Sequence, residues 1–147
     1  MLPMGAAKTD DAEFLARFEA GALPRAEWTH AAHVRVAFLC LRAEAAFEMA
    51  LGRIRRGIRH HNEAQGIANT ETSGYHETLT QAWGRLVAAA LAHDAGASAD
   101  AAAFLSAHPG LLRQETLLEH YSRARLMSPE ARAGWLPPDL LPLPEPS

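Results

Sequence analysis

The sequence predicts an all-α protein, because residues that favour helices dominate it and residues that favour strands are rare. Alanine supplies about a fifth of the 147 residues, whereas valine and isoleucine together occur only six times. Helices favour alanine, leucine, glutamate and arginine, whereas strands favour β-branched residues. Several stretches also place apolar residues every three or four positions, which is the spacing of an amphipathic helix. We expect a central bundle of about six helices.

Length and composition limit the kind of protein this is. The length suits one domain over residues 1–147, with an ordered core over about 10–135 and an extended proline-rich tail over 136–147. The net charge of −3 argues against a nucleic-acid partner, and the single cysteine excludes an internal disulfide framework. No apolar run is long enough to cross a membrane, and the first residues lack the pattern of a signal peptide. A cytoplasmic location follows as an expectation.

Capping residues and turn residues predict where the helices begin and end. The first helix starts at Asp10 or Asp11 and stops at Gly21, and Thr29 is a plausible cap for the second. A polar loop is expected over 67–74, and Ser128 followed by a proline begins a last short helix. The remaining helices are expected over 27–42, 43–62, 73–93, 100–107 and 111–121.

Three apolar helix faces each run into histidine at one end. His30 and His33 lie on the apolar face of the second helix, and His61 continues the apolar seam of the third. In the fourth helix, one turn before the seam begins, the chain carries His76 or Tyr75. Consecutive helices joined by short loops pack antiparallel. We therefore expect these histidines to converge at one end of the bundle.

A cluster of this kind is suited to binding a divalent metal. His30 and His33 are three positions apart, so both imidazoles can reach one ion. His76 would be a third ligand, and Glu27 or His61 a fourth. Imidazole suits Zn, Fe, Mn and Ni, so the residues do not choose the ion.

The leading hypothesis is a metal-dependent enzyme that acts on a small molecule. The bound ion would activate water or polarise a carbonyl, which leaves hydrolase and oxidoreductase chemistry open. Glu77 would be the general base, and Tyr75 would donate a hydrogen bond to the substrate.

Two other hypotheses use the same residues without a metal. In the first, the pocket is a binding module for an anionic small molecule, held by helix N-termini and by nearby arginines such as Arg123 and Arg125. In the second, the histidines cap helices or are buried, and the protein is an interaction module or a homodimer through an alanine-rich face. Trp28 and Trp83 are expected to be core anchors, and Cys40 a buried apolar group.

Three stretches resemble those of a group of small, uncharacterised bacterial helical proteins. They are WTHAAH at 28–33, GYHETLT at 74–80 and SPEAR at 128–132, and the resemblance extends over about 13–140. The end-on histidine cluster is also similar to that of the DinB-type helical bundles, a resemblance that implies three histidines around a divalent metal. That family has two ligands four residues apart on a late helix, whereas the pair here is three apart and early.

Overall fold

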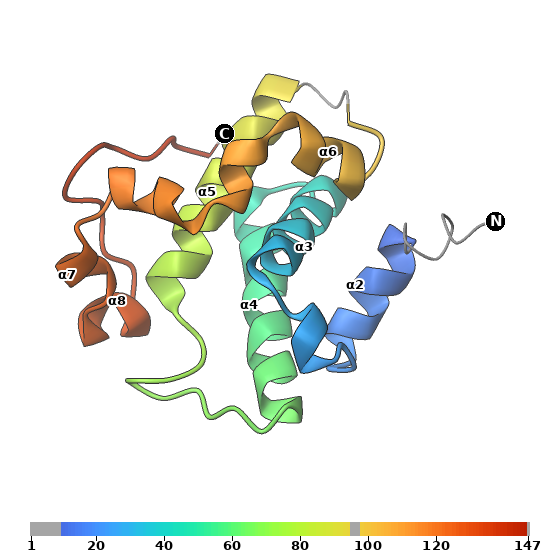
Figure 1. Ribbon diagram of the computed structural model, residues 1–147, viewed down its shortest axis with the longest axis horizontal. Helices are drawn as coiled ribbons and strands as arrows, with labels where there is room; N and C mark the ends of the chain where they lie inside the picture. Colours follow the sequence, from blue (N-terminus) through green and yellow to red (C-terminus); the bar gives the residue numbers. More distant parts are fainter. Residues whose placement is uncertain (1–9, 95–97, 147) are drawn as a thin grey trace.

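The computed structural model describes residues 10–94 and 98–146, and within them it contains helices and no strand (Figure 1). The all-α prediction is therefore confirmed for the described part of the chain. Instead of about six helices, these residues form seven α-helices and three short 3₁₀ helices. In chain order they are α2 (Asp11–Glu19), η1 (Arg25–Glu27), α3 (His30–Ala43), α4 (Phe47–Ala64), α5 (Glu77–Asp94), α6 (Ala101–Ala107), η2 (Pro109–Leu112), η3 (Gln114–Glu119), α7 (Arg123–Leu126) and α8 (Pro129–Ala133).

Side-chain caps start several of the helices, as the sequence predicts. Asp10 accepts a hydrogen bond from the Ala12 amide at the start of α2, and Thr29 accepts one from Ala32 at the start of α3. Ser128 does the same for α8, whose first residue is a proline. A cap that the sequence analysis missed is Ser122, which begins the short helix α7.

Helices α3, α4 and α5 pack against one another at the centre of the molecule (Figure 1). Helix α2 packs on α4, α6 covers α3, and α8 packs on α5. The contact between α2 and α4 depends on Gly57, because a Cβ there would overlap the ring of Phe18. Phe18 is fully buried, so the glycine lets the two helices approach closely.

The buried side chains form two hydrophobic clusters. The larger one lies between α2, α3 and α4 and extends to α5, α6 and η2. It includes Phe18, Phe38 and Ile54. The smaller one lies under the C-terminal segments and includes the fully buried Tyr121. Trp83 of α5 packs against both clusters, so its indole ring lies at the boundary between them.

The predicted helix over 111–121 is wrong. The chain forms η2 and η3 instead, with Arg113 extended between them at φ −101° and ψ 115°. Leu111 is buried in the larger cluster, whereas Leu117 is buried in the smaller one. The two short helices place these side chains in separate clusters, so tertiary packing overrides the local helical preference.

The third and fourth helices also begin later than predicted. Helix α4 starts at Phe47 because Glu44 is extended, at φ −96° and ψ 148°. Before α5, Gly74 has a φ of +79°, and the Tyr75 amide donates a hydrogen bond to the Asn69 side chain. These two features hold the backbone out of a helix until Glu77.

Residues 136–146 carry no helix or strand and lie against η3 and α7. Tyr121 donates its hydroxyl hydrogen to the carbonyl of Leu136 at 2.6 Å, and Arg125 donates to the carbonyl of Pro137 at 2.7 Å. Leu143 is buried in the smaller cluster. This segment therefore holds in place the short helices that contribute to the pocket described next.

Candidate functional site

A cavity of about 640 Å³ lies where the two hydrophobic clusters meet. Its volume is within the range of about 300–1,000 Å³ that is usual for small-molecule sites. Its walls come from α3, α4 and α5 on one side and from η3 and α7 on the other. The lining residues are Trp28, His30, His33, Ala37, Ile54, Ile58, Leu79, Thr80, Trp83, Gln114, Glu115, Leu117, Leu118, Arg123, Leu126 and Met127.

His30 belongs to the first turn of α3 and meets the Trp83 ring edge-on, with ring centroids 4.6 Å apart. Its Nε2 lies 2.9 Å from the carbonyl oxygen of Leu111. Because a carbonyl only accepts, Nε2 carries the proton and Nδ1 holds a free lone pair. Burial lowers the pKa of His30, although the Leu111 bond and the charge of Glu115 oppose that shift. His30 is therefore a neutral hydrogen-bond acceptor on the cavity wall.

His33 lies one turn further along α3, stacked on Trp28 with ring centroids 3.7 Å apart. Its Nδ1 donates to the carbonyl of Thr29 at 2.8 Å, so the lone pair is on Nε2. Burial lowers its pKa to about 4 against this bond, and neighbouring His30 and His61 lower it further. A ring with that pKa is neutral at pH 7 and is a weak proton acceptor there.

His61 lies behind Trp28, with ring centroids 4.9 Å apart, and does not line the cavity. Its Nε2 donates to the carbonyl of Leu23 at 3.1 Å, and its buried Nδ1 has no hydrogen-bond partner. Burial lowers its pKa. The structure thus brings His33 and His61 together on Trp28, whereas the ring contact of His30 is with Trp83.

His76 lies apart from that group, directly before α5. The Leu79 amide donates to its Nδ1 at 3.0 Å, and its Nε2 donates to the carbonyl of Leu126 at 2.9 Å. Both ring nitrogens are therefore occupied, and burial lowers the pKa of the ring. The side chain links the start of α5 to the end of α7, which lines the cavity.

The two residues expected to be catalytic, Glu77 and Tyr75, form a hydrogen-bonded group outside the cavity. Tyr75 donates its hydroxyl hydrogen to Glu77 at 2.6 Å, and Arg55 and Gln81 also donate to that carboxylate. Burial raises the pKa of Glu77, but these hydrogen bonds outweigh it and lower the pKa to about 2. Burial, together with the bond to Glu77, raises the pKa of Tyr75 to about 12. A carboxylate with so low a pKa and so many donors is a poor proton acceptor, so Glu77 is better suited to linking α4 to α5 than to acting as a general base.

Glu27, the other expected metal ligand, is exposed in η1 and pairs with Arg17 at 3.5 Å. Across residues 10–94 and 98–146, no three or more histidine, cysteine, aspartate or glutamate side chains are arranged to hold a metal ion. The divalent-metal hypothesis stays an untested prediction.

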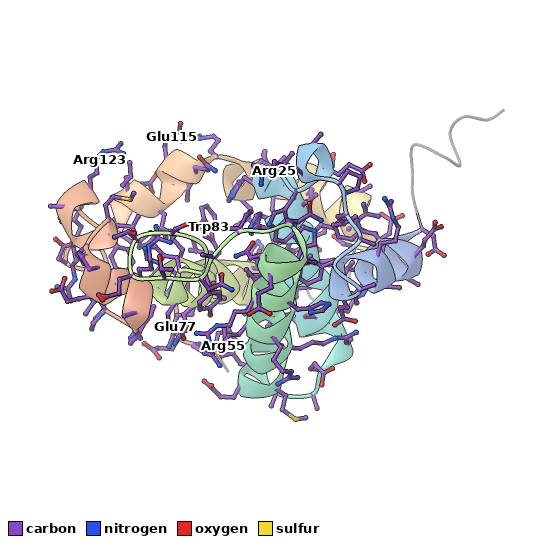
Figure 2. All side chains as sticks on the ribbon, turned by 90° about the horizontal axis from the view of Figure 1, so that it is seen from below. Arg25, Arg55, Glu77, Trp83, Glu115 and Arg123 are labelled. Atoms are coloured by element: carbon purple, nitrogen blue, oxygen red, sulfur yellow. The ribbon has the colours of Figure 1, made fainter. Side chains whose placement is uncertain are left out.

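Charged and polar groups gather at the edge of the cavity. Glu115 and Gln114 come from η3, and Arg123 comes from α7. Figure 2 shows Glu115 and Arg123 projecting on the same side of the molecule. In that view Arg55 and Glu77 lie on the other side, and Trp83 lies between the two groups. Of the two arginines proposed from the sequence, only Arg123 lines the cavity, because Arg125 donates to the tail.

A second hollow of about 430 Å³ is lined by Glu19, Glu44, Arg53, Arg56, Gly57 and His60. Its central cation is already paired, because Arg53 donates to Glu19 at 2.7 and 3.1 Å and to Glu44 at 3.2 Å. Arg53 is thus used within the fold, where it links α4 to α2 and to Glu44. The cavity beside Trp83 is the better candidate for a functional site.

Sequence reasoning missed the contributions of η3 to this site. Gln114, Glu115 and Leu118 were not singled out, because a straight helix over 111–121 gives no reason to place them near His30. Trp28 and Trp83 were expected to be core anchors, and they are also cavity walls. The only sequence signal was their position within about two turns of the histidines.

Comparison with protein-family models, with curated proteins and with solved structures finds no match to the chain in any of the three. Within the described residues, no helix combines the length and the apolar character that crossing a membrane requires.

Proposed function

We propose that this protein binds a small, mostly apolar molecule in the cavity beside Trp28 and Trp83. The single observation that carries the proposal is the lining of a cavity of about 640 Å³ by two tryptophans, aliphatic side chains and a few polar groups. Ligand sites typically combine a large apolar wall with few, fixed polar groups. The position at the junction of two clusters lets a ligand contact both.

The two histidines on the wall support a ligand that donates hydrogen bonds. Nδ1 of His30 and Nε2 of His33 are lone-pair acceptors, because the other nitrogen of each ring donates to a backbone carbonyl. The low pKa of His33, about 4, favours hydrogen-bond acceptance over proton removal at neutral pH. These features favour recognition over acid–base chemistry.

The proposal is tested with ethylbenzene as an apolar probe. Trp28 and Trp83 line the cavity and Trp135 does not, so the variant Trp135→Phe reports binding through its remaining tryptophan fluorescence. We expect saturable quenching and a higher melting temperature. No change in either signal across the solubility range would contradict the proposal.

A cavity-filling pair provides the matched control. Ala37 is buried on α3 and lines the cavity, whereas Ala31 on the same helix is exposed and does not. Ala37→Leu should weaken ethylbenzene binding without unfolding the protein, and Ala31→Leu should leave binding unchanged. Equal affinity in both variants would place the probe elsewhere.

The second candidate is the metal-dependent reaction, with His30 and His33 as the two ligands from this chain. The observation that favours it is that both rings are oriented by donating to a carbonyl, as metal-bound histidines commonly are. Elemental analysis of untagged protein tests it. Near-stoichiometric Zn, Fe, Mn or Ni that is lost in His30→Ala would support this candidate. Protein that is purified without metal and binds none of the four ions when they are added would contradict it.

A further inference from the structure

Two opposite charges at the mouth of the cavity have no partner. Glu115 and Arg123 both line the cavity and are exposed. Among the described residues neither side chain makes a hydrogen bond or an ion pair, even with the other, whereas Arg53 and Arg55 on α4 are both paired with glutamates. The mouth therefore offers one anionic and one cationic group above an apolar interior.

The two charges come from different elements of the lining, Glu115 from η3 and Arg123 from the first residue of α7. Glu115 is close enough to His30 for its charge to oppose the fall in that ring's pKa, and both side chains line the cavity. The Nδ1 lone pair of His30 adds a second acceptor near the carboxylate.

This arrangement discriminates between ligands by charge. A purely cationic ligand would be attracted by Glu115 but repelled by Arg123, and a purely anionic ligand would be attracted by Arg123 but repelled by Glu115. A ligand that carries both charges at one end and an apolar group at the other would satisfy both side chains. Arginine binds carboxylates well because its planar group can donate two parallel hydrogen bonds.

We propose that the ligand is a free α-amino acid with a large apolar or aromatic side chain. The inference rests on the proposed function, because it needs the cavity to take the side chain. That side chain lies against Trp28 and Trp83. The ammonium group is bound by Glu115 and His30, and the carboxylate is bound by Arg123.

Four related compounds separate the contributions to binding. Ethylbenzene has the apolar group alone, phenethylamine adds the ammonium, 3-phenylpropionate adds the carboxylate, and L-phenylalanine carries both. None absorbs at the wavelength that excites tryptophan, so all four can be titrated by fluorescence of Trp135→Phe. We expect L-phenylalanine to bind most tightly, with each rim pair worth roughly 2- to 5-fold in affinity at low salt.

Removing one charge at a time assigns each group of the ligand. Glu115→Gln should weaken L-phenylalanine and phenethylamine and leave 3-phenylpropionate no weaker. Arg123→Gln should weaken L-phenylalanine and 3-phenylpropionate and leave phenethylamine no weaker. The matched controls are Glu119→Gln on the same element as Glu115 and Arg25→Gln on η1, both exposed and outside the lining.

The outcomes distinguish this inference from the proposed function. If ethylbenzene binds but L-phenylalanine binds no tighter, the amino-acid assignment is overturned and the cavity remains a binding site. If either singly charged compound equals L-phenylalanine, the ligand needs only one charge and the assignment is again overturned. If none of the four compounds binds, both proposals fail.

Discussion

Arg55 donates two hydrogen bonds to Glu77, from Nε at 2.9 Å and from a terminal guanidinium nitrogen at 2.7 Å, and so joins α4 to the start of α5. The Glu77 side chain is 12% exposed, which makes this pair more shielded than an ordinary surface ion pair. Tyr75 and Gln81 complete the shell around the carboxylate. The pair positions α5, and with it Trp83, against the other two central helices.

Loss of the Glu77 charge should destabilise the fold. In Glu77→Gln, Arg55 loses its charged partner, and we expect the free energy of unfolding to fall by about 2 kcal/mol. Urea denaturation checks this, with Arg56→Met as the control because Arg56 is exposed on the same helix. An equal loss in both variants would contradict the importance of the pair.

The same carboxylate gives a stability contribution that depends on pH. The pKa of Glu77 is about 2 in the folded protein against 4.5 in an unperturbed glutamate, so the unfolded chain binds the proton first as pH falls. The contribution is present in full above about pH 4.5 and is lost as pH falls towards 2. Glu77→Gln should flatten the melting-temperature profile in that window. An unchanged acid limb would be inconsistent with the shift.

As pH falls, His33 should produce a separate loss of stability that begins at a higher pH than the loss due to Glu77. Its pKa is about 4 when folded and 6.5 when unperturbed, so below pH 6.5 the unfolded chain takes up a proton that the folded ring refuses. The contribution of His33 to this loss should grow as pH falls from 6.5 to 4 and should stay constant below pH 4. His33→Phe keeps a ring against Trp28 and should reduce this decline, whereas exposed His93→Phe should not. Identical profiles for the two variants would disprove the assignment.

His76 should stabilise the cavity wall as well as the fold. His76→Phe removes the bonds to the Leu79 amide and the Leu126 carbonyl, leaving buried groups unpaired at a cost of roughly 2–3 kcal/mol. Because Leu126 lines the cavity, binding of ethylbenzene should weaken too. Denaturation and fluorescence titration check the two effects, with His93→Phe as the control. A variant that is destabilised but binds normally would limit His76 to the fold.

Two glycines of α4 should respond in opposite directions to alanine. Gly57→Ala places a methyl group into the Phe18 ring and should cost about 1–3 kcal/mol. Gly52 faces only the flexible end of Arg56, so Gly52→Ala should stabilise the helix by about 0.5–1 kcal/mol. Thermal melts of both variants check the signs. Shifts in the same direction would show that the α2–α4 contact is not tight at Gly57.

The features that the sequence predicts correctly are those with a local signal. Asp10, Thr29 and Ser128 cap helices because a short polar side chain can reach an amide two or three residues away, whatever the rest of the chain does. The apolar faces of 27–42 and 43–62 likewise indicate two helices that bury one side. The register that follows puts His30 and His33 on one face of α3, and the structure has them there.

The candidate site depended on contacts that no local pattern reports. Whether a histidine has a free lone pair is decided by carbonyl groups distant in sequence, and the bond from His76 to Leu126 spans 50 residues. That bond occupies the ring, whereas His30 bonds Leu111 through Nε2 and keeps Nδ1 free. Spacing alone treats the two histidines as equivalent.

By itself the sequence determined the helical class, the caps and the face on which His30 and His33 lie, because these follow from propensities and from spacing along one helix. Only the tertiary structure decided that the segment 111–121 breaks into two short helices and brings Glu115 to the cavity. The physical reason is that Leu111 and Leu117 are buried in different clusters, and the free energy of burying both exceeds the modest preference of that segment for one straight helix.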